Sequence, residues 1–186
     1  RPGPIVGYAA QKDTAKINQY FSSPAIRAVI PQNVKLIWAV KPTDPDSKIF
    51  ELYALKATGM GGPALGGDVI SDSRADYDQQ GNPEVIMIMN GDGAHAWKNI
   101  TNAAAGNPES KEDNKSVAIV LDNVVYSAPT VQNEIPNGIS SISGNFTVDD
   151  TKDLANVLKA GRLPAPARIV SEYIVGPSLG AESIKN

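Results

Sequence analysis

Apolar and polar residues alternate with the period of a β-strand along two early stretches of the chain. In residues 34–40, Val34, Leu36 and Trp38 share one face, and residues 49–57 are similarly rich in aliphatic and aromatic side chains. A polar loop with two prolines joins the two stretches. The pattern therefore predicts an antiparallel hairpin.

A helix is predicted ahead of this hairpin. Ile17, Tyr20 and Phe21 recur at helical spacing, and Asp13 stands where an N-terminal cap is expected. Residues 1–7 are rich in proline and glycine and predict an extended lead-in.

Beyond a glycine-rich stretch at residues 59–67, the pattern changes to strands on either side of a helix. Residues 68–78 predict a strand with a polar edge, and residues 84–90 are apolar on both faces, as in a central, buried strand. Asp92 is predicted to cap the following helix, which turns Trp97 and its helical neighbours inward.

The remaining elements are short and marked by turn residues. Residues 117–121 predict a buried strand, and Asp122 and Asn123 close it into a hairpin because both residue types tolerate the type I′ turn. Another short strand is predicted at residues 139–143.

The last helix has the clearest local signal. Thr147 and Asp150 match a capping box of the form T-x-x-[DE]. Behind them, Leu154 and Leu158 belong to one apolar stripe, and Gly161 suits the C-terminal end.

Strands that pair through hairpins and are separated by helices predict an α+β fold with mostly antiparallel sheets and packed helices, in two lobes. The stretch at residues 59–67 divides the lobes, and residues 168–175 predict a final strand that returns to the first lobe. Joints rich in glycine and proline are typical of hinges. The candidate hinge residues are Gly59, Gly61, Gly62, Pro63, Gly66, Gly67, Pro164 and Pro166.

Composition limits the partners and the kinds of site that this chain can have. The net charge of -3 and the lack of a basic block argue against nucleic acid. The chain has no cysteine, which excludes disulfides, thiolate nucleophiles and zinc–sulfur sites. No apolar run reaches the roughly 20 residues that a membrane helix needs. Because the chain starts at Arg1 without a signal peptide, we expect a piece of a longer protein whose other parts carry any membrane anchor.

Few side chains suggest catalysis. The single histidine, His95, has no serine or aspartate at a useful spacing, which favours a structural or solvent-facing role. Asp76 and Asp78 would act as a catalytic pair only across a cleft, and Asp149 and Asp150 are explained as first-turn acids of a helix. We therefore predict no catalytic residue, no cofactor and no metal site.

Two further motifs favour structural interpretations. Gly59 and Gly61 resemble part of a dinucleotide fingerprint, but no helical pattern begins after them, so a linker is favoured over a phosphate loop. Met87, Met89 and Trp97 occur at strand and helix spacing, which favours the core, with a soft peptide groove as the alternative.

Four ordered motifs resemble one protein family. Residues 121–131 read LDNVVYSAPTV, which is similar to a stretch of the SecD family, accessory subunits of the bacterial Sec protein translocase. Similar stretches follow in the family's order at residues 139–147, 154–166 and 175–183. Asn123 stands where the family usually has glycine, and asparagine also tolerates the turn. The sequence before residue 61 is similar to fused SecDF proteins of Bacteroidetes-type bacteria.

The resemblance implies the first periplasmic domain of SecD, with ferredoxin-like elements in a base and a projecting head. Residues 1–60 would be the base-proximal segment, residues 61–164 the head, and residues 165–186 a return strand that leads to a transmembrane helix. It implies a non-enzymatic domain on the periplasmic side of the inner membrane. The domain would bind the unfolded translocating polypeptide during proton-gradient-driven export, with SecF and the SecYEG channel as partners.

Two other functions stay open on the residues alone. One is a carboxylate-dependent hydrolase that uses Asp76 or Asp78 with His95. The other is a periplasmic domain that binds a small ligand or peptide in a cleft between the lobes, where a dedicated pocket would saturate at micromolar concentration or below.

Overall fold

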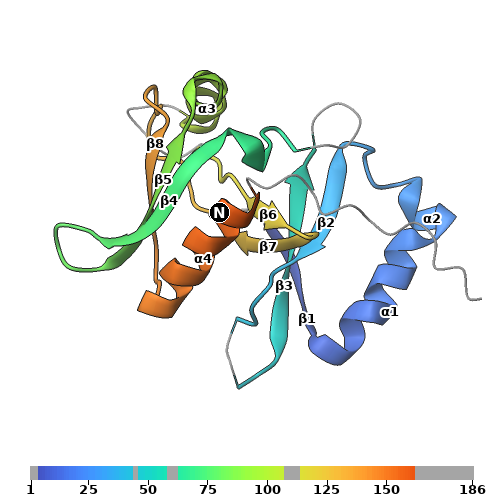
Figure 1. Cartoon of the computed structure of the whole chain (residues 1–186). Helices are drawn as coiled ribbons and strands as arrows, with labels where there is room; N and C mark the ends of the chain where they lie inside the picture. Colours follow the sequence, from blue (N-terminus) through green and yellow to red (C-terminus); the bar gives the residue numbers. More distant parts are fainter. Residues whose placement is uncertain (1–3, 44–45, 58–62, 107–113, 162–186) are drawn as a thin grey trace, which may run out of the picture.

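The computed structural model describes residues 4–43, 46–57, 63–106 and 114–161. These residues form two lobes of mixed helix and antiparallel sheet, which confirms the predicted fold class (Figure 1). We call the part from Ile5 to Lys56 the base lobe and the part from Gly67 to Gly161 the head lobe.

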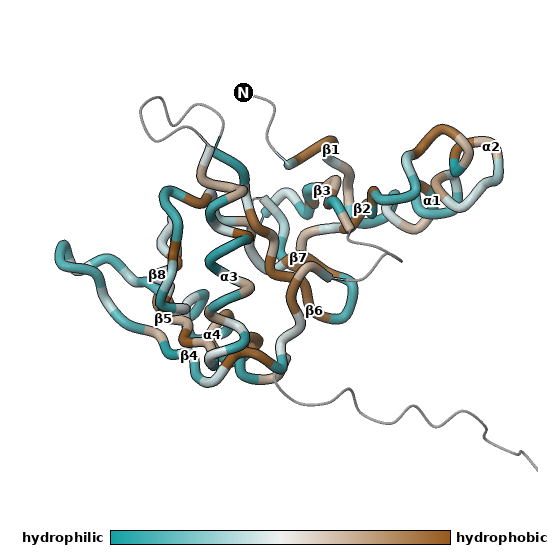
Figure 2. The backbone as a smooth tube through the Cα atoms, turned by 90° about the horizontal axis from the view of Figure 1, so that it is seen from above, coloured by the Kyte–Doolittle hydropathy of each residue, from teal (hydrophilic) through white to brown (hydrophobic). Residues whose placement is uncertain are grey.

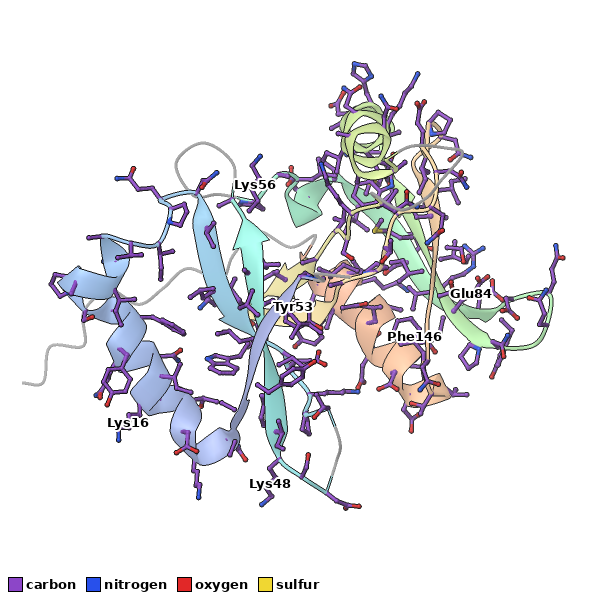
Figure 3. All side chains as sticks on the ribbon, turned by 180° about the vertical axis from the view of Figure 1, so that it is seen from behind. Lys16, Lys48, Tyr53, Lys56, Glu84 and Phe146 are labelled. Atoms are coloured by element: carbon purple, nitrogen blue, oxygen red, sulfur yellow. The ribbon has the colours of Figure 1, made fainter. Side chains whose placement is uncertain are left out.

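The base lobe is a three-stranded sheet in the order β1-β3-β2 with two helices. The strands are β1 (Ile5–Ala10), β2 (Val34–Trp38) and β3 (Ile49–Lys56), and the helices are α1 (Gln11–Ser22) and α2 (Pro24–Arg27). The predicted hairpin is confirmed, because β2 and β3 pair antiparallel along their length. In Figure 3, Lys48 and Lys56 mark the two ends of β3.

The two faces of the base sheet have different neighbours. Trp38 lies opposite Leu52, and its indole N–H donates a hydrogen bond to the Asn18 side chain of α1 (2.9 Å). This face therefore packs against α1. Ile37 and Tyr53 lie opposite each other on the other face, which is turned toward the head lobe (Figure 1).

The N-terminal part differs from the prediction. The expected lead-in joins the sheet from Ile5 onward as β1, and α1 begins directly after it with Ala10 as N-cap. Asp13 lies inside the first turn and does not cap the helix. Because the strand runs straight into the helix, no loop residue is left to cap it, and Asp13 instead complements the positive end of the helix dipole.

The head lobe contains a sheet in the order β4-β5-β8, a two-stranded ribbon and two long helices. These are η1 (Gly67–Val69), β4 (Ile70–Tyr77), β5 (Pro83–Met89), α3 (Gly91–Ala104), β6 (Ile119–Leu121), β7 (Val124–Ser127), β8 (Ile139–Ser143) and α4 (Val148–Gly161). Figure 2 shows α3 and α4 on the same side of the head sheet, between it and the rest of the molecule.

The core of the head lobe lies between its sheet and α4. As predicted, β5 is the central strand, and Val85, Met87 and Met89 are buried with Leu154 and other residues of α4. The expected core role of the two methionines is thereby confirmed. Trp97 packs at the edge of the same cluster.

Two local predictions are confirmed at the level of hydrogen bonds and dihedral angles. The backbone N–H of Thr147 donates to Asp150 Oδ2 (2.9 Å), and the N–H of Asp150 donates to Thr147 Oγ1 (3.2 Å), which is a reciprocal capping box. Asp122 and Asn123 have φ angles of 49° and 63°, the left-handed geometry of a type I′ turn.

Two other predictions are wrong. Asn90, not Asp92, caps α3, because its side chain accepts a hydrogen bond from the N–H of Gly93 (2.8 Å) while Asp92 lies in the first turn. The strand predicted as buried at residues 117–121 is shorter and only partly buried. Its ribbon lies on the side of the head lobe that faces the base lobe, and Ile119 and Tyr126 pack against the head core (Figure 1).

Candidate functional site

The two lobes meet where the chain leaves β2 and runs beside β7. Ala39 forms a parallel bridge with Val125, and the N–H of Val40 donates to the Val125 carbonyl (2.8 Å). The N–H of Ala39 also donates to the Glu51 carbonyl of β3 (2.9 Å), so this short segment is bonded to both lobes. The backbone contact fixes the point at which the base touches the head.

The next residue, Lys41, reaches from this segment to α4. Its Nζ lies 2.5 Å from Asp150 Oδ1 and 3.4 Å from Asp153 Oδ2. The Asp150 side chain is 28% exposed, whereas that of Asp153 is 61% exposed. We call Lys41, Asp150 and Asp153 the junction clamp.

Hydrogen bonding makes Asp150 strongly acidic. The Lys41 ammonium, followed by the hydroxyl and backbone N–H of Thr147, lowers the pKa of Asp150 from 3.8 to about 2, because all three donors stabilise the carboxylate. The bond to Asp150 in turn raises the pKa of Lys41. Both groups are therefore charged throughout the neutral range, and the clamp is an ion pair.

A pocket of about 170 Å³ lies beside the junction clamp. Val40, Tyr126, Phe146 and Leu154 form its apolar wall, so both lobes contribute to it. In Figure 3, Phe146 lies beside α4. Pockets for drug-sized ligands usually hold roughly 300–1,000 Å³. The geometry thus favours an incompletely packed lobe contact over a dedicated ligand cleft.

The outer face of the head sheet, turned away from α3 and α4, carries apolar side chains. Ile88 of β5 lies opposite Ile139 of β8, which is 50% exposed, and Ile86 lies opposite Ser141. Ser141 donates a hydrogen bond to Glu84 at the polar end of this face. Among the described residues no helix covers it (Figure 2). We use the name outer face for these five residues.

The residues considered for hydrolysis serve other purposes in the structure. Asp76 pairs with Arg74 (3.5 Å), and Asp78 organises the turn after β4 by accepting hydrogen bonds from Asn82. These bonds, the side-chain bond first, lower the pKa of Asp78. His95 is exposed on α3, in keeping with the predicted solvent-facing role.

Within the described ranges, no group of three or more metal-ligating side chains comes together.

Most candidate hinge residues, namely Gly59, Gly61, Gly62, Pro164 and Pro166, lie outside the described residues, as does the return strand predicted at residues 168–175. Gly67 is the first residue of η1, and a Cβ at this position would collide with the backbone carbonyl of Gly161. The missing side chain at Gly67 therefore permits close packing against α4. A hinge at Pro63 and Gly66 stays a prediction.

Sequence reasoning does not find Lys41, which lies in a polar loop 109 residues before Asp150. A partial signal exists on α4. Asp150 and Asp153 are spaced i, i+3 on one helix face, and neither has a basic residue four positions later. This spacing indicates a cationic partner elsewhere, although it does not identify which lysine or arginine supplies it.

Comparisons with known proteins place most of the chain in one family. Residues 49–165 match the family model described as SecDF, P1 head subdomain. The chain is 40% identical over 183 residues to the protein translocase subunit SecD of Rhodothermus marinus, with 98% of the chain and 28% of that protein covered. It is 34% identical over 187 residues to SecD of Desulfurispirillum indicum, covering 97% of the chain and 33% of that protein.

A crystal structure of SecDF from Thermus thermophilus, described as a translocon-associated membrane protein, is 28% identical with a TM-score of 0.48, covering 81% of this chain and 17% of that one. The chain thus spans a third or less of the length of these relatives. None of the helices in the described ranges has the length and apolar character needed to cross a membrane.

Proposed function

The chain belongs to the SecD/SecDF family of protein translocase subunits, and from this premise we propose that it is an extracytoplasmic domain of the Sec export machinery that holds the emerging preprotein. In this role the head lobe contacts the unfolded polypeptide and helps to complete its proton-gradient-driven translocation. Proton-carrying groups would belong to membrane-spanning parts of the longer protein. SecF and the SecYEG channel are the proposed partners.

The outer face is the observation that best supports client binding. An extended polypeptide presents backbone polar groups and alternate side chains, which suit a pleated surface with a few apolar residues and an open strand edge. Ile86, Ile88 and Ile139 supply such a surface, and β8 is an edge strand. Contacts of this kind are weak and tolerate many sequences, so they allow the client to be released.

The proposed division of labour follows the two sheets. Residues 1–60 would form the base-proximal segment and residues 61–164 the head, with the joint between them in the glycine-rich stretch at residues 59–67. The base would hold the head at a set position near the membrane, and the head would meet the client.

Crosslinking tests client binding directly, because the chain has no cysteine of its own. Ile139→Cys and Ser141→Cys on the outer face, introduced in the full-length protein, are expected to form adducts with a stalled secretory client in cells. Val29→Cys, on the exposed loop after α2, is the matched control and is expected to form none. If no cysteine on the head lobe gives an adduct while export proceeds, the proposal is wrong.

The hydrolase alternative has a separate test. Asp76→Asn, Asp78→Asn and His95→Ala, combined in one protein, are expected to leave export at the wild-type level. Loss of export in this variant, with the fold intact, would revive a catalytic role. The small-ligand alternative gains no support from the pocket beside the clamp, which is smaller than such ligands need.

A further inference from the structure

In the described part of the chain, a backbone contact and a side-chain contact on different elements join the lobes. The backbone of Val40 bonds to Val125 of β7, and the side chain of Lys41 bonds to Asp150 of α4. A single stretch of backbone pairing defines where two bodies touch but leaves rotation about that contact. A second attachment on another element is what fixes the angle between them.

The attraction at the second attachment depends on the carboxylates. The N-terminal end of a helix carries positive partial charge, which disfavours a nearby ammonium group. Lys41 stays at this end of α4 because Asp150 and Asp153 outweigh the dipole. Asp150 is held independently by the two donors of Thr147, so the ion pair can open without unwinding α4.

Packing directly beside the clamp is incomplete. The pocket of about 170 Å³ leaves the apolar wall of Val40, Tyr126 and Phe146 without full contact across the junction. Where partner atoms are missing, few dispersion contacts are lost when the surfaces move apart. The well-packed apolar contact at Val125, which is 2% exposed, lies at the pivot, so the charged contact acts where the packing between the lobes is incomplete.

We propose that the junction clamp is an ionic latch that holds head and base in the observed orientation, and that its opening lets the head turn about the contact between Val40 and Val125. Lys41 is a positioning residue in this device. The inference goes beyond the proposed function, because it concerns the angle between the lobes whether or not the chain binds a polypeptide.

Distance measurements between paired spin labels test the latch in the 186-residue chain. Val29→Cys in the base and Tyr77→Cys in the head are both exposed and, without native cysteines, label uniquely. The test variant is Lys41→Met, which keeps the aliphatic stem and removes the charge. The matched control is Lys152→Met, an identical charge change at a lysine that pairs with Asp149 within α4 (3.7 Å).

Wild type and Lys152→Met are expected to give the same narrow distance distribution. In Lys41→Met the population outside this distribution rises by roughly two- to fivefold, the shift that exposed ion pairs produce. At 1 M salt, where the Debye length is about 3 Å, the wild type moves toward the variant and the variant itself does not change.

Identical distributions for Lys41→Met and Lys152→Met at low and high salt overturn the latch. Thermal unfolding of each variant checks that both lobes stay folded. If Lys41→Met unfolds, Asp153→Asn provides the same test at an exposed residue outside the capping box, with a smaller broadening expected. Because the readout is a distance and not export, its outcome is independent of the crosslinking result.

Discussion

Replacing Asp150 separates the two tasks of this residue, which completes the capping box of α4 with Thr147 and pairs with Lys41. In Asp150→Ala both are lost. Loss of the hydrogen bond from Thr147 to Asp150 costs about 0.5–1.5 kcal/mol, and loss of a partly exposed ion pair costs about 0.2–1 kcal/mol. We therefore expect the free energy of unfolding to fall by roughly 1–2.5 kcal/mol. Asp150→Asn keeps an acceptor for the Thr147 donors and should lose mainly the smaller, ionic part.

Urea denaturation followed by circular dichroism measures these differences, and pH adds a second test. The folded-state pKa of Asp150 is about 2, below its ordinary 3.8, so its contribution is fully present above pH 3.8 and is lost as pH falls through about 2. The stability difference between wild type and Asp150→Ala should therefore shrink between pH 6 and pH 2.

Asp149→Ala is the control for Asp150→Ala. Asp149 occupies the same helical turn and carries the same charge, but it is highly exposed, and its ion pair is with Lys152 of the same helix, at 3.7 Å. It should change stability little. Equal losses of stability in Asp149→Ala and Asp150→Ala would refute the reasoning. So would a difference in free energy of unfolding between wild type and Asp150→Ala that stays constant down to pH 2.

Three further predictions concern the head lobe and are tested by denaturation. Val85→Ala should lower the free energy of unfolding by about 2–3 kcal/mol, since two buried methyl groups are removed from a side chain that is 0% exposed, and a value near zero would contradict its core position. Gly67→Ala should lower the free energy of unfolding by about 1–3 kcal/mol, because the new Cβ meets the Gly161 backbone. In Gly66→Ala the new Cβ meets only the flexible carboxylate of Asp68, so the loss should be smaller. A larger loss for Gly66→Ala than for Gly67→Ala would contradict this packing. Because Asn123 has a φ of 63°, Asn123→Gly should leave stability nearly unchanged and Asn123→Val should clearly lower it. Equal denaturation midpoints for the two variants would contradict the turn geometry.

The features predicted correctly depend on residues close together in the sequence. Thr147 and Asp150 are three residues apart, and the turn at Asp122 and Asn123 is complete in two residues, so each signal contains its own partner. The central position of β5 could also be predicted from local sequence, because a strand with apolar side chains on both faces is usually covered on both sides.

The features missed depend on partners far along the chain. β1 forms because β3 offers an edge to it, although Pro4, Gly7 and the exposed Tyr8 give no strand pattern of their own. The helix cap at Asn90 shows a smaller failure. Two polar residues suitable as caps lie two positions apart, and the strand before them, which ends at Met89, decides which one stands at the boundary.

The same limit explains why the sequence offers arguments against catalysis but could not predict the junction. A catalytic site needs particular residue types, so a single histidine and the lack of cysteine already narrow the choice. A lobe junction needs only one lysine among the seventeen basic side chains, placed by two separate sheets against a pair of carboxylates.

For a domain that holds polypeptides of varied sequence, affinity at any one surface has to stay low, and useful selectivity then comes from where that surface is presented. In this chain the outer face lies on the side of the head sheet turned away from α3 and α4, and the proposed latch would set the position of the whole sheet relative to the base through contacts at Val40 and Lys41. Substitutions at the junction should therefore alter client handling without touching the client. Changes on the outer face should alter contact without altering orientation. If substitutions at the junction and on the outer face always changed both client contact and lobe orientation, contact and orientation would not be separate properties of this domain.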